Sequence, residues 1–432
     1  MLTAISRYGV RAVPETRAII RRCETRGELI EGPEIEQFER AFAARLGSGT
    51  AVATSYGRMA FFHILRALDL PAGSEIVIPA LTFWVIPELA RRVGLRPVFA
   101  DVDPATFTLD PAALERAITP ATRAVVPTHL YGLPCDMDPI VTIARRHGLA
   151  IIEDCAHALG ATYRGRPVGT LGDAALFSFQ TLKPLNAFGG GMAVIQDPAV
   201  AQRVRAQVSS LPWPDEGRVR NRFKIGRAQR FFTQPGMFTL FAFPILWTAS
   251  WFNANPDVYL WETIRPLDPL PAAYRERFPN AQAALGLAAL ERLDAWTAAS
   301  QKHARAIDRV LAGSPGVQVP VVPDDRTHVY YQYCVYVPDR DDLVIRCIRR
   351  GIDIETLHVD VCTRLALFSD LQSAPTPGAD RASAAVQVPV YASLSDPQVD
   401  RIARAVGRAV DGRGETDHAR VGVPQRVRGS RR

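Results

Sequence analysis

Lysine is the charged residue that this sequence uses least. The 432-residue chain has 51 basic residues, and only Lys183, Lys224 and Lys302 among them are lysines. The guanidinium of arginine stays protonated and is a poor nucleophile, whereas a lysine amine can lose its proton in a desolvated site and form a Schiff base. A chain that prefers arginine so strongly is expected to keep a lysine where only an amine serves.

Several features that mark other classes of protein are also missing. The six cysteines include no CxxC pair, and the first residues, MLTAISRYGVRAVPETR, contain no apolar core of signal-peptide length. A cytoplasmic, reducing compartment is therefore expected. The net charge of +7 is spread along the chain without helix-turn-helix or zinc-ligand spacing. We therefore expect neither nucleic-acid binding nor a metal site.

Two patterns alternate along the first half of the chain. Short apolar runs such as EIVIPA, RAVVPTH and LAIIEDC are separated by helical patterns such as DPIVTIARRHG. This order predicts βαβ crossovers onto a largely parallel, buried sheet in an α/β fold. Functional residues are then expected at the carboxyl ends of the strands.

The chain is predicted to divide into four parts. Residues 1–217 form a large domain, to which a helix within 271–300 returns. Residues 301–412 form a smaller α+β domain that contains YYQYCVYV and VDRIARAVGRAV. Residues 218–270 form a basic and aromatic insertion, and residues 413–432 form a disordered basic tail.

The insertion has an unusual composition. Six basic residues and no acid lie between Arg218 and Arg230, and residues 231–256 carry eight Phe and Trp residues but no charge. Pro235 and Pro244 interrupt this segment, and its unbroken apolar part is too short to span a bilayer. Two interpretations remain open: a lid or dimer interface, or a surface that rests on the anionic inner membrane face. The second interpretation would suit a lipid-attached substrate.

Lys183 lies where carbonyl chemistry is expected. It stands in FSFQTLKPLNAFGGGMAVI, between a strand-like run and three glycines, and it follows Asp154, which ends the run LAIIED. An enzyme that uses pyridoxal phosphate (PLP) needs a lysine, a carboxylate against the pyridine nitrogen, an anion cradle and a flat contact for the ring. Asp154 suits the carboxylate role, although a helix cap or turn residue has the same appearance.

Further residues at predicted strand ends suit the remaining roles. Gly57 and Arg58, after Tyr56, stand where a strand turns into a helix, whose first free amides bind phosphate. Phe83 offers a ring for stacking, and the Ser178 hydroxyl offers a phosphate contact. Each also has an ordinary structural interpretation: a first-turn arginine, a core aromatic, or a serine bonded to backbone.

Together these stretches resemble the DegT/StrS type of PLP-dependent sugar aminotransferases. The matching segments lie between about Glu34 and Val410 and include EIVIPALTF, FADVDPATFTLD, HGLAIIEDCAHALGATYRGRPVGTLGDAALFSF, NAQAALGLAALERLD and VPVYASLSD. The resemblance implies PLP fold type I, with a mostly parallel sheet flanked by helices and a smaller α+β C-terminal domain. It also implies a homodimer.

The resemblance assigns roles by position. Lys183 becomes the Schiff-base lysine and Asp154 the partner of the pyridine nitrogen, while Gly57, Arg58 and Ser178 surround the phosphate and Phe83 stacks on the ring. His157 takes the place beside the phenolic oxygen where the family generally has glutamine. Arg58 itself replaces a common threonine. Arg275 occupies the position of an asparagine that usually reaches the partner subunit's phosphate, and Asn280 lies only nearby in the sequence, which leaves that contact open.

The expected function is transfer of an amino group from glutamate or glutamine to a keto sugar linked to a nucleotide or a lipid. Related sugar dehydratases typically have histidine in place of the lysine, so Lys183 argues against dehydration. Two alternatives from other classes are a PLP-binding sensor of the same fold without turnover and a hydrolase that uses Ser178 with His129 or His157. The sequence contains no GxSxG motif to support the hydrolase.

Overall fold

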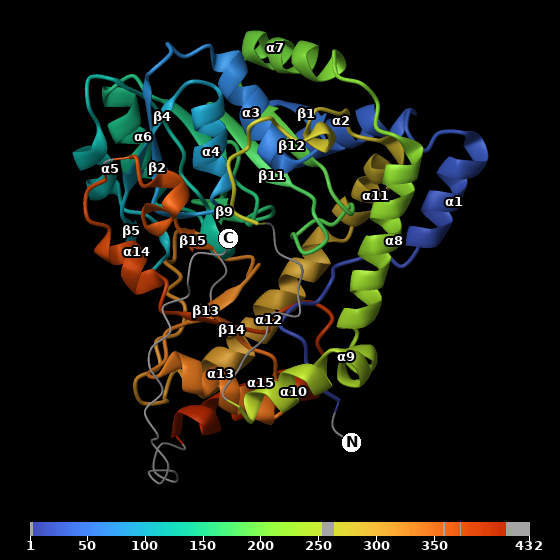
Figure 1. The fold of residues 1–432 in the computed structure, drawn as a ribbon, viewed down its shortest axis with the longest axis vertical. Coiled ribbons are helices and arrows are strands. Elements are labelled where there is room, and N and C mark those ends of the chain that lie inside the picture. The colour runs from blue at the N-terminus through green and yellow to red at the C-terminus, as the bar shows by residue number, and fades with distance from the viewer. Residues whose placement is uncertain (1–2, 253–262, 357–358, 372, 412–432) are drawn as a thin grey trace.

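The computed structural model describes residues 3–252, 263–356, 359–371 and 373–411. The predicted basic tail and residues 253–262 of the predicted insertion lie outside these residues. Figure 1 shows a sheet-containing part with its surrounding helices above a smaller part built around α13 and α15.

A seven-stranded sheet forms the centre of the large domain. Its strand order is β1-β12-β11-β8-β7-β2-β4. β12 is antiparallel to both of its neighbours, and the other six strands share one direction. The strands are β1 (Thr50–Thr54), β2 (Glu75–Pro79), β4 (Arg96–Ala100), β7 (Thr122–Val125), β8 (Ala150–Asp154), β11 (Ala174–Ser178) and β12 (Gly191–Ile195). The predicted α/β class with a largely parallel sheet is confirmed.

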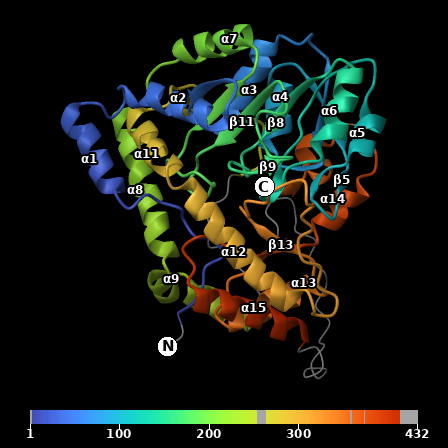
Figure 2. The same ribbon diagram turned by 180° about the vertical axis from the view of Figure 1, so that it is seen from behind.

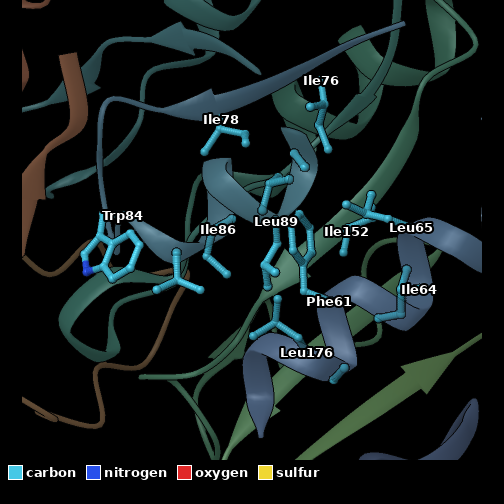
Figure 3. Packing of buried hydrophobic residues seen from close by; sticks show 14 of the residues in the cluster. Phe61, Ile64, Leu65, Ile76, Ile78, Trp84, Ile86, Leu89, Ile152 and Leu176 are labelled. Atoms are coloured by element: carbon cyan, nitrogen blue, oxygen red, sulfur yellow. The ribbon is translucent and has the colours of Figure 1, made fainter. Parts of the chain in front are cut away.

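Apolar residues cover both faces of this sheet. Successive side chains of a strand point to opposite faces. Accordingly, Ile76 and Ile78 of β2 join one core cluster, whereas Val77 joins another. Figure 3 shows Phe61 and Leu89, from two helices, packed beside Ile152 in the first cluster. A strand that is buried on both faces is stabilised by an apolar side chain at every position. Its sequence is therefore a continuous apolar run and does not alternate between apolar and polar residues.

Helices form the outer layers of the large domain. Those that pack on the first cluster are α3 (Gly57–Leu68), α4 (Val85–Arg92) and α7 (Pro198–Ser209). Those on the opposite face are α1 (Thr16–Arg26), α2 (Glu34–Leu46), α5 (Pro111–Ala117), α6 (Met137–Arg146) and α11 (Asn280–Leu290). The domain also contains two short antiparallel strand pairs outside the main sheet: β5 (Val102–Asp103) with β6 (Thr108–Leu109), and β9 (Thr162–Tyr163) with β10 (Arg166–Pro167).

The smaller domain has its own sheet and core. Antiparallel β13 (Tyr333–Val335), β16 (Val386–Val388) and β14 (Glu355–Thr356) pack with α13 (Arg340–Arg349) and α15 (Asp396–Asp411). α14 (Pro377–Ala382) and the pairing of β15 (Asp360–Val361) with β3 (Leu81–Thr82) lie against the large domain.

Helix α12 and the start of the chain each link the two domains. α12 (Leu293–Leu311) has Leu293 in a large-domain core and Ile307 in the small-domain core, and Figure 2 shows it passing from one domain to the other. Ile5, near the chain start, also packs in the small-domain core and forms a bridge with Ile352. The domain boundaries predicted above remain a prediction.

Within its described residues, the insertion forms three helices along the side and end of the molecule: α8 (Glu216–Thr233), α9 (Pro235–Phe241) and α10 (Phe243–Ser250). The Asp215 carboxylate accepts a hydrogen bond from the Arg218 amide and caps α8. Figure 1 shows α8 descending from the large domain to α9 and α10 beside the small domain. Among the described residues, no helix is both long and apolar enough to cross a membrane.

Candidate active site

Lys183 lies in the loop that joins β11 to β12. Its amide donates to the carbonyl of Gln180 at 2.9 Å, which forms a turn. Three glycines end the loop, and two of them, Gly189 and Gly190, have positive φ angles of 132° and 94°. A Cβ on Gly191 would lie 2.3 Å from the Gly57 nitrogen, so the loop can return to the sheet beside α3 only with glycine there.

Asp154 lies at the carboxyl end of β8, close enough to Lys183 for their charges to interact. Burial lowers the pKa of Lys183 to about 8, against the opposing effect of Asp154, and the Arg58 cation lowers it further. Burial raises the pKa of Asp154, while the Ala156 amide, which donates to its Oδ1 at 3.0 Å, and the Lys183 charge oppose that rise. The amine of the half-buried Lys183 therefore interacts electrostatically with the buried Asp154 carboxylate at the sheet's carboxyl edge.

The Tyr331 ring lies close to both Lys183 and His157. The Lys183 Nζ is 5.0 Å from the centroid of the Tyr331 ring, and the imidazole of His157 stacks on the same ring at 4.2 Å. The Tyr131 amide donates to Nδ1 of His157 at 3.4 Å. Burial raises the pKa of Tyr331, so its hydroxyl stays protonated near neutral pH.

The amino end of α3 lies where the sequence predicts an anion cradle. α3 starts at Gly57, no side chain caps its free amides, and Ser178 of β11 lies directly against it. A Cβ on Gly57 would approach both the Phe177 carbonyl oxygen and the Ser178 Cβ to 2.8 Å, so only glycine allows this contact. The Met59 and Ala60 amides donate to the Tyr56 carbonyl, and the positive end of the helix dipole at Gly57 favours a nearby anion such as phosphate.

Arg58 and Phe83 meet beside this cradle. The buried Arg58 donates through Nη1 to the Tyr274 hydroxyl, and its guanidinium carbon lies 5.1 Å from the Phe83 ring centroid. Tyr56 and Tyr274 present their rings to the same guanidinium at 5.6 and 5.2 Å. Phe83 keeps 36% of its surface exposed, so part of this side chain is accessible to another group.

Comparison of the sequence with models of known protein families identifies the family to which the chain belongs. A model of the DegT/DnrJ/EryC1/StrS aminotransferase family matches residues 12–407. The chain belongs to this family. The predicted family, the PLP fold type I architecture and the aminotransferase class are confirmed.

Two curated relatives and one solved structure illustrate the similarity of this family member to known proteins. The dTDP-3-amino-3,4,6-trideoxy-alpha-D-glucose transaminase of Streptomyces venezuelae is 33% identical over 397 residues, covering 91% of each chain. The GDP-perosamine synthase of Caulobacter vibrioides is 32% identical over 389 residues, covering 88% of this chain and 91% of the relative. The structure of S. venezuelae DesV in complex with a ketimine intermediate superposes with a TM-score of 0.73 at 31% identity, over 92% and 94% of the two chains.

In this DegT/StrS-type chain, two residues near the site gave no signal of a role there in the sequence. Tyr331 belongs to an aromatic run typical of a buried strand. Arg222 belongs to the basic half of the insertion, yet its guanidinium donates to the Tyr56 hydroxyl at 2.9 Å and to Oε1 of Gln282 at 3.1 Å. Only the folded position of α8 places Arg222 next to the cradle.

A buried cluster of His129, Glu153 and Cys155 lies at the end of β8, next to Asp154. Their potential ligand atoms lie within 4.8 Å of one another and form the metal-type cluster found among the described residues. The Glu153 carboxylate already accepts hydrogen bonds from the amides of Gly169, Leu171 and Gly172 and pairs with Nε2 of His129 at 3.0 Å. Protein donors thus satisfy this carboxylate, and the group fixes the end of β8, where Asp154 follows.

Proposed function

We propose that this chain is a PLP-dependent aminotransferase that transfers an amino group from glutamate or glutamine to a keto sugar. The observation that carries the proposal is the half-buried Lys183, whose amine interacts electrostatically with Asp154 at the sheet's carboxyl edge and with Arg58 in the first turn of α3. The relatives named as an amino-sugar transaminase and a perosamine synthase support a sugar as the acceptor.

The residues present fit PLP group by group. Lys183 would hold the cofactor's aldehyde carbon, and Asp154 would face its ring nitrogen. The Gly57 amide, Arg58 and Ser178 would hold the phosphate, while Phe83 and His157 would contact the ring. When bound, PLP supplies an electron sink for the carbon next to the transferred nitrogen.

Lys183 is suited to move protons in this reaction. With a pKa of about 8, about a tenth of its amine is neutral at pH 7 in the cofactor-free protein. A neutral amine can take a proton from a substrate carbon and return it as an ammonium group, and such catalysis works best with a pKa near the working pH. Asp154 keeps its charge best when a cation faces it, because burial alone favours its neutral form.

The proposal extends to partners and location. We infer a homodimer in the cytoplasm, with an acceptor linked to a nucleotide or a lipid and a peripheral contact with the inner membrane face. The resemblance places Arg275 where the family usually has a partner-facing asparagine, so we infer that a cross-subunit phosphate contact made by Arg275 would be an ion pair.

The decisive experiment compares single variants in a half-reaction. Lys183→Ala should remove the visible absorbance of lysine-bound PLP and abolish keto-acid formation from glutamate or glutamine, while Asp154→Asn should keep cofactor binding and slow turnover by about a hundredfold or more. Lys302→Ala is the matched control, because Lys302 is exposed and paired with Asp396. An unchanged spectrum in Lys183→Ala would refute the assignment, and a wild-type protein that binds PLP but converts no donor would indicate the sensor alternative.

A further inference from the structure

Exposed apolar side chains gather on one part of the molecule. Of the twelve large hydrophobic residues that are exposed among the described residues, nine lie between Ile225 and Phe252. The most exposed are Phe252 at 80%, Leu240 at 68% and Ile245 at 58%. Scattered exposed apolar residues are common in soluble proteins, but a gathered set indicates an interaction surface.

These side chains point outward because other residues of the same helices fill the cores. Val219 and Phe223 of α8 pack in a large-domain core, and Phe238 of α9 and Leu246 of α10 pack in the small-domain core. The three helices are therefore anchored to both domains. Their remaining apolar residues have no place in either core.

The outward residues contact one another. The Phe232 ring lies edge-on to Phe231 at 5.4 Å and to Phe241 at 5.7 Å, which joins the end of α8 to α9. On α10, Trp247 lies 5.7 Å from Trp251. We call this surface, from Ile225 to Phe252 on α8, α9 and α10, the α8–α10 face.

The charges beside the α8–α10 face have one sign. Residues 217–256 contain no aspartate or glutamate. Near the start of α8, Arg218 and Arg220 are paired with Glu276 and Glu24. Lys224 and Arg227 are exposed further along α8, and no carboxylate in the described part of the chain pairs with them. These two cations adjoin the apolar surface and can meet negative groups of a partner.

Arg349 of α13 holds the other end of the α8–α10 face in place. Its guanidinium carbon lies 4.7 Å from the Trp251 ring centroid, and its Nη2 donates to the Ser250 carbonyl at 2.6 Å. These contacts fix the Trp251 indole, which is 57% exposed, at the end of α10.

We propose that the α8–α10 face docks on an anionic lipid bilayer. Phenylalanine, leucine and isoleucine side chains would enter the boundary between headgroups and acyl chains, with tryptophans at headgroup level and Lys224 and Arg227 on the phosphates. The contact is peripheral, in keeping with the absence of a membrane-crossing helix among the described residues. This inference concerns a surface away from the Lys183 chemistry and does not depend on it.

A bilayer fits this face better than a second copy of the chain. In a twofold interface the same patch lies on both subunits, so the Lys224 and Arg227 charges of both copies would be brought into one interface that contains no acid from residues 217–256. An anionic membrane instead supplies the missing negative charge and tolerates the irregular outline of exposed rings.

The test uses the full chain loaded with PLP and vesicle flotation. Vesicles of phosphatidylcholine with a quarter of phosphatidylglycerol should bind the protein at least about tenfold more tightly than phosphatidylcholine alone, and high salt should weaken that binding. The triple variant Leu240→Ser/Ile245→Ser/Phe252→Ser should lose binding by about tenfold or more, because it removes three of the largest exposed apolar surfaces. Lys224→Gln/Arg227→Gln should weaken binding to the anionic vesicles by about tenfold.

Matched control variants distinguish the effect of the α8–α10 face from the effect of removing exposed apolar or charged residues elsewhere on the protein. Val310→Ser/Val321→Ser removes apolar residues that are 45% and 51% exposed elsewhere, and Arg123→Gln/Arg166→Gln removes two exposed cations elsewhere. Both controls should float like the wild type, and all variants should keep the wild-type far-UV circular dichroism spectrum and thermal unfolding midpoint as proof of folding.

Two results would overturn the proposal. One is unchanged flotation of the triple serine variant. The other is a drop from dimer to monomer of that variant in sedimentation velocity without lipid, which would make the face an interface between copies.

Discussion

At the scale of single residues, the environment of Lys183 determines what its amine can do. Burial has the largest effect on its pKa and lowers it. The Asp154 carboxylate raises this pKa, and the Arg58 cation lowers it. The chain has only two other lysines, so the reactivity of this amine can be measured in the intact protein with two internal references.

We expect competitive acetylation of the cofactor-free protein to show Lys183 half neutral near pH 8 instead of near 10.5. Asp154→Asn should move that midpoint to lower pH, because the carboxylate stabilises the ammonium form, and Arg58→Met should move it to higher pH. Mass spectrometry of the three lysine peptides over a pH series measures all of this, with Lys224 and Lys302 calibrating the reagent. A midpoint near 10 in the wild type, or shifts of opposite sign in the variants, would contradict the described environment.

The same pKa has a defined effect on stability. Between pH 8 and 10.5 the unfolded chain holds a proton on Lys183 that the folded, cofactor-free chain has released. The free energy of unfolding of that form should therefore receive from Lys183 a contribution that rises with pH across this window.

Lys183 and Asp154 could be selected from the sequence because each follows a recognisable apolar run and each has a chemistry that its neighbours lack. Tyr331 could not be selected, since it belongs to a run of aromatic residues in which position along the chain does not reveal which ring faces the amine. The role of each selected residue toward PLP is still a prediction.

At the scale of elements, the join between β1 and α3 depends on close packing. Gly57 brings the first turn of α3 against the end of β11, with no room for a Cβ. The sequence indicated a strand followed by a helix here. It could not indicate that β12 and its glycine run would return to the same point, because that contact joins segments more than a hundred residues apart.

Gly57→Ala should therefore destabilise the protein by about 1–3 kcal/mol through overpacking and weaken PLP retention by displacing the cradle. Urea unfolding and dialysis against PLP-free buffer measure the two effects. Gly313→Ala provides the control, because nothing lies within 4 Å of its added Cβ, and it should change stability by less than about 0.5 kcal/mol. Equal behaviour of the two variants would show that the close packing at Gly57 is relaxed in solution.

The composition of the insertion predicted the character of its surface but not the contacts that its helices make. Its basic and aromatic halves were apparent from the sequence, and both interpretations of its surface followed from them. The sequence did not show that α8 carries Arg222 to the Tyr56 hydroxyl, since the helix direction depends on Val219 and Phe223 packing in the large-domain core.

At the scale of the whole molecule, the chain start is tied to the small domain by a buried ion pair. Arg7 contacts Asp353 at 2.6 Å and Glu355 at 3.2 Å, with its side chain only 4% exposed. No local pattern in the sequence predicts a contact between residues 346 positions apart. By sequence order alone, residue 7 was placed with the large domain.

Arg7→Ala should lower the free energy of unfolding by about 3–5 kcal/mol, because it leaves a carboxylate buried without its cation. Arg40→Ala, at an exposed pair with Glu36, should cost about 0.3–0.5 kcal/mol and serves as the control. Chemical denaturation of both variants measures the difference. The double variant Arg7→Ala/Asp353→Asn should regain part of the loss, and failure to do so would mean that charge burial is not the cause.

All six cysteines of the chain are buried free thiols. A maleimide reagent should therefore have little access to them in the native protein, and a single new thiol at Ile245 or Phe252 would be the preferred point of attachment. A nitroxide placed there would report its immersion depth through collisions with oxygen or a water-soluble nickel complex, in a protein that needs no prior removal of its native cysteines.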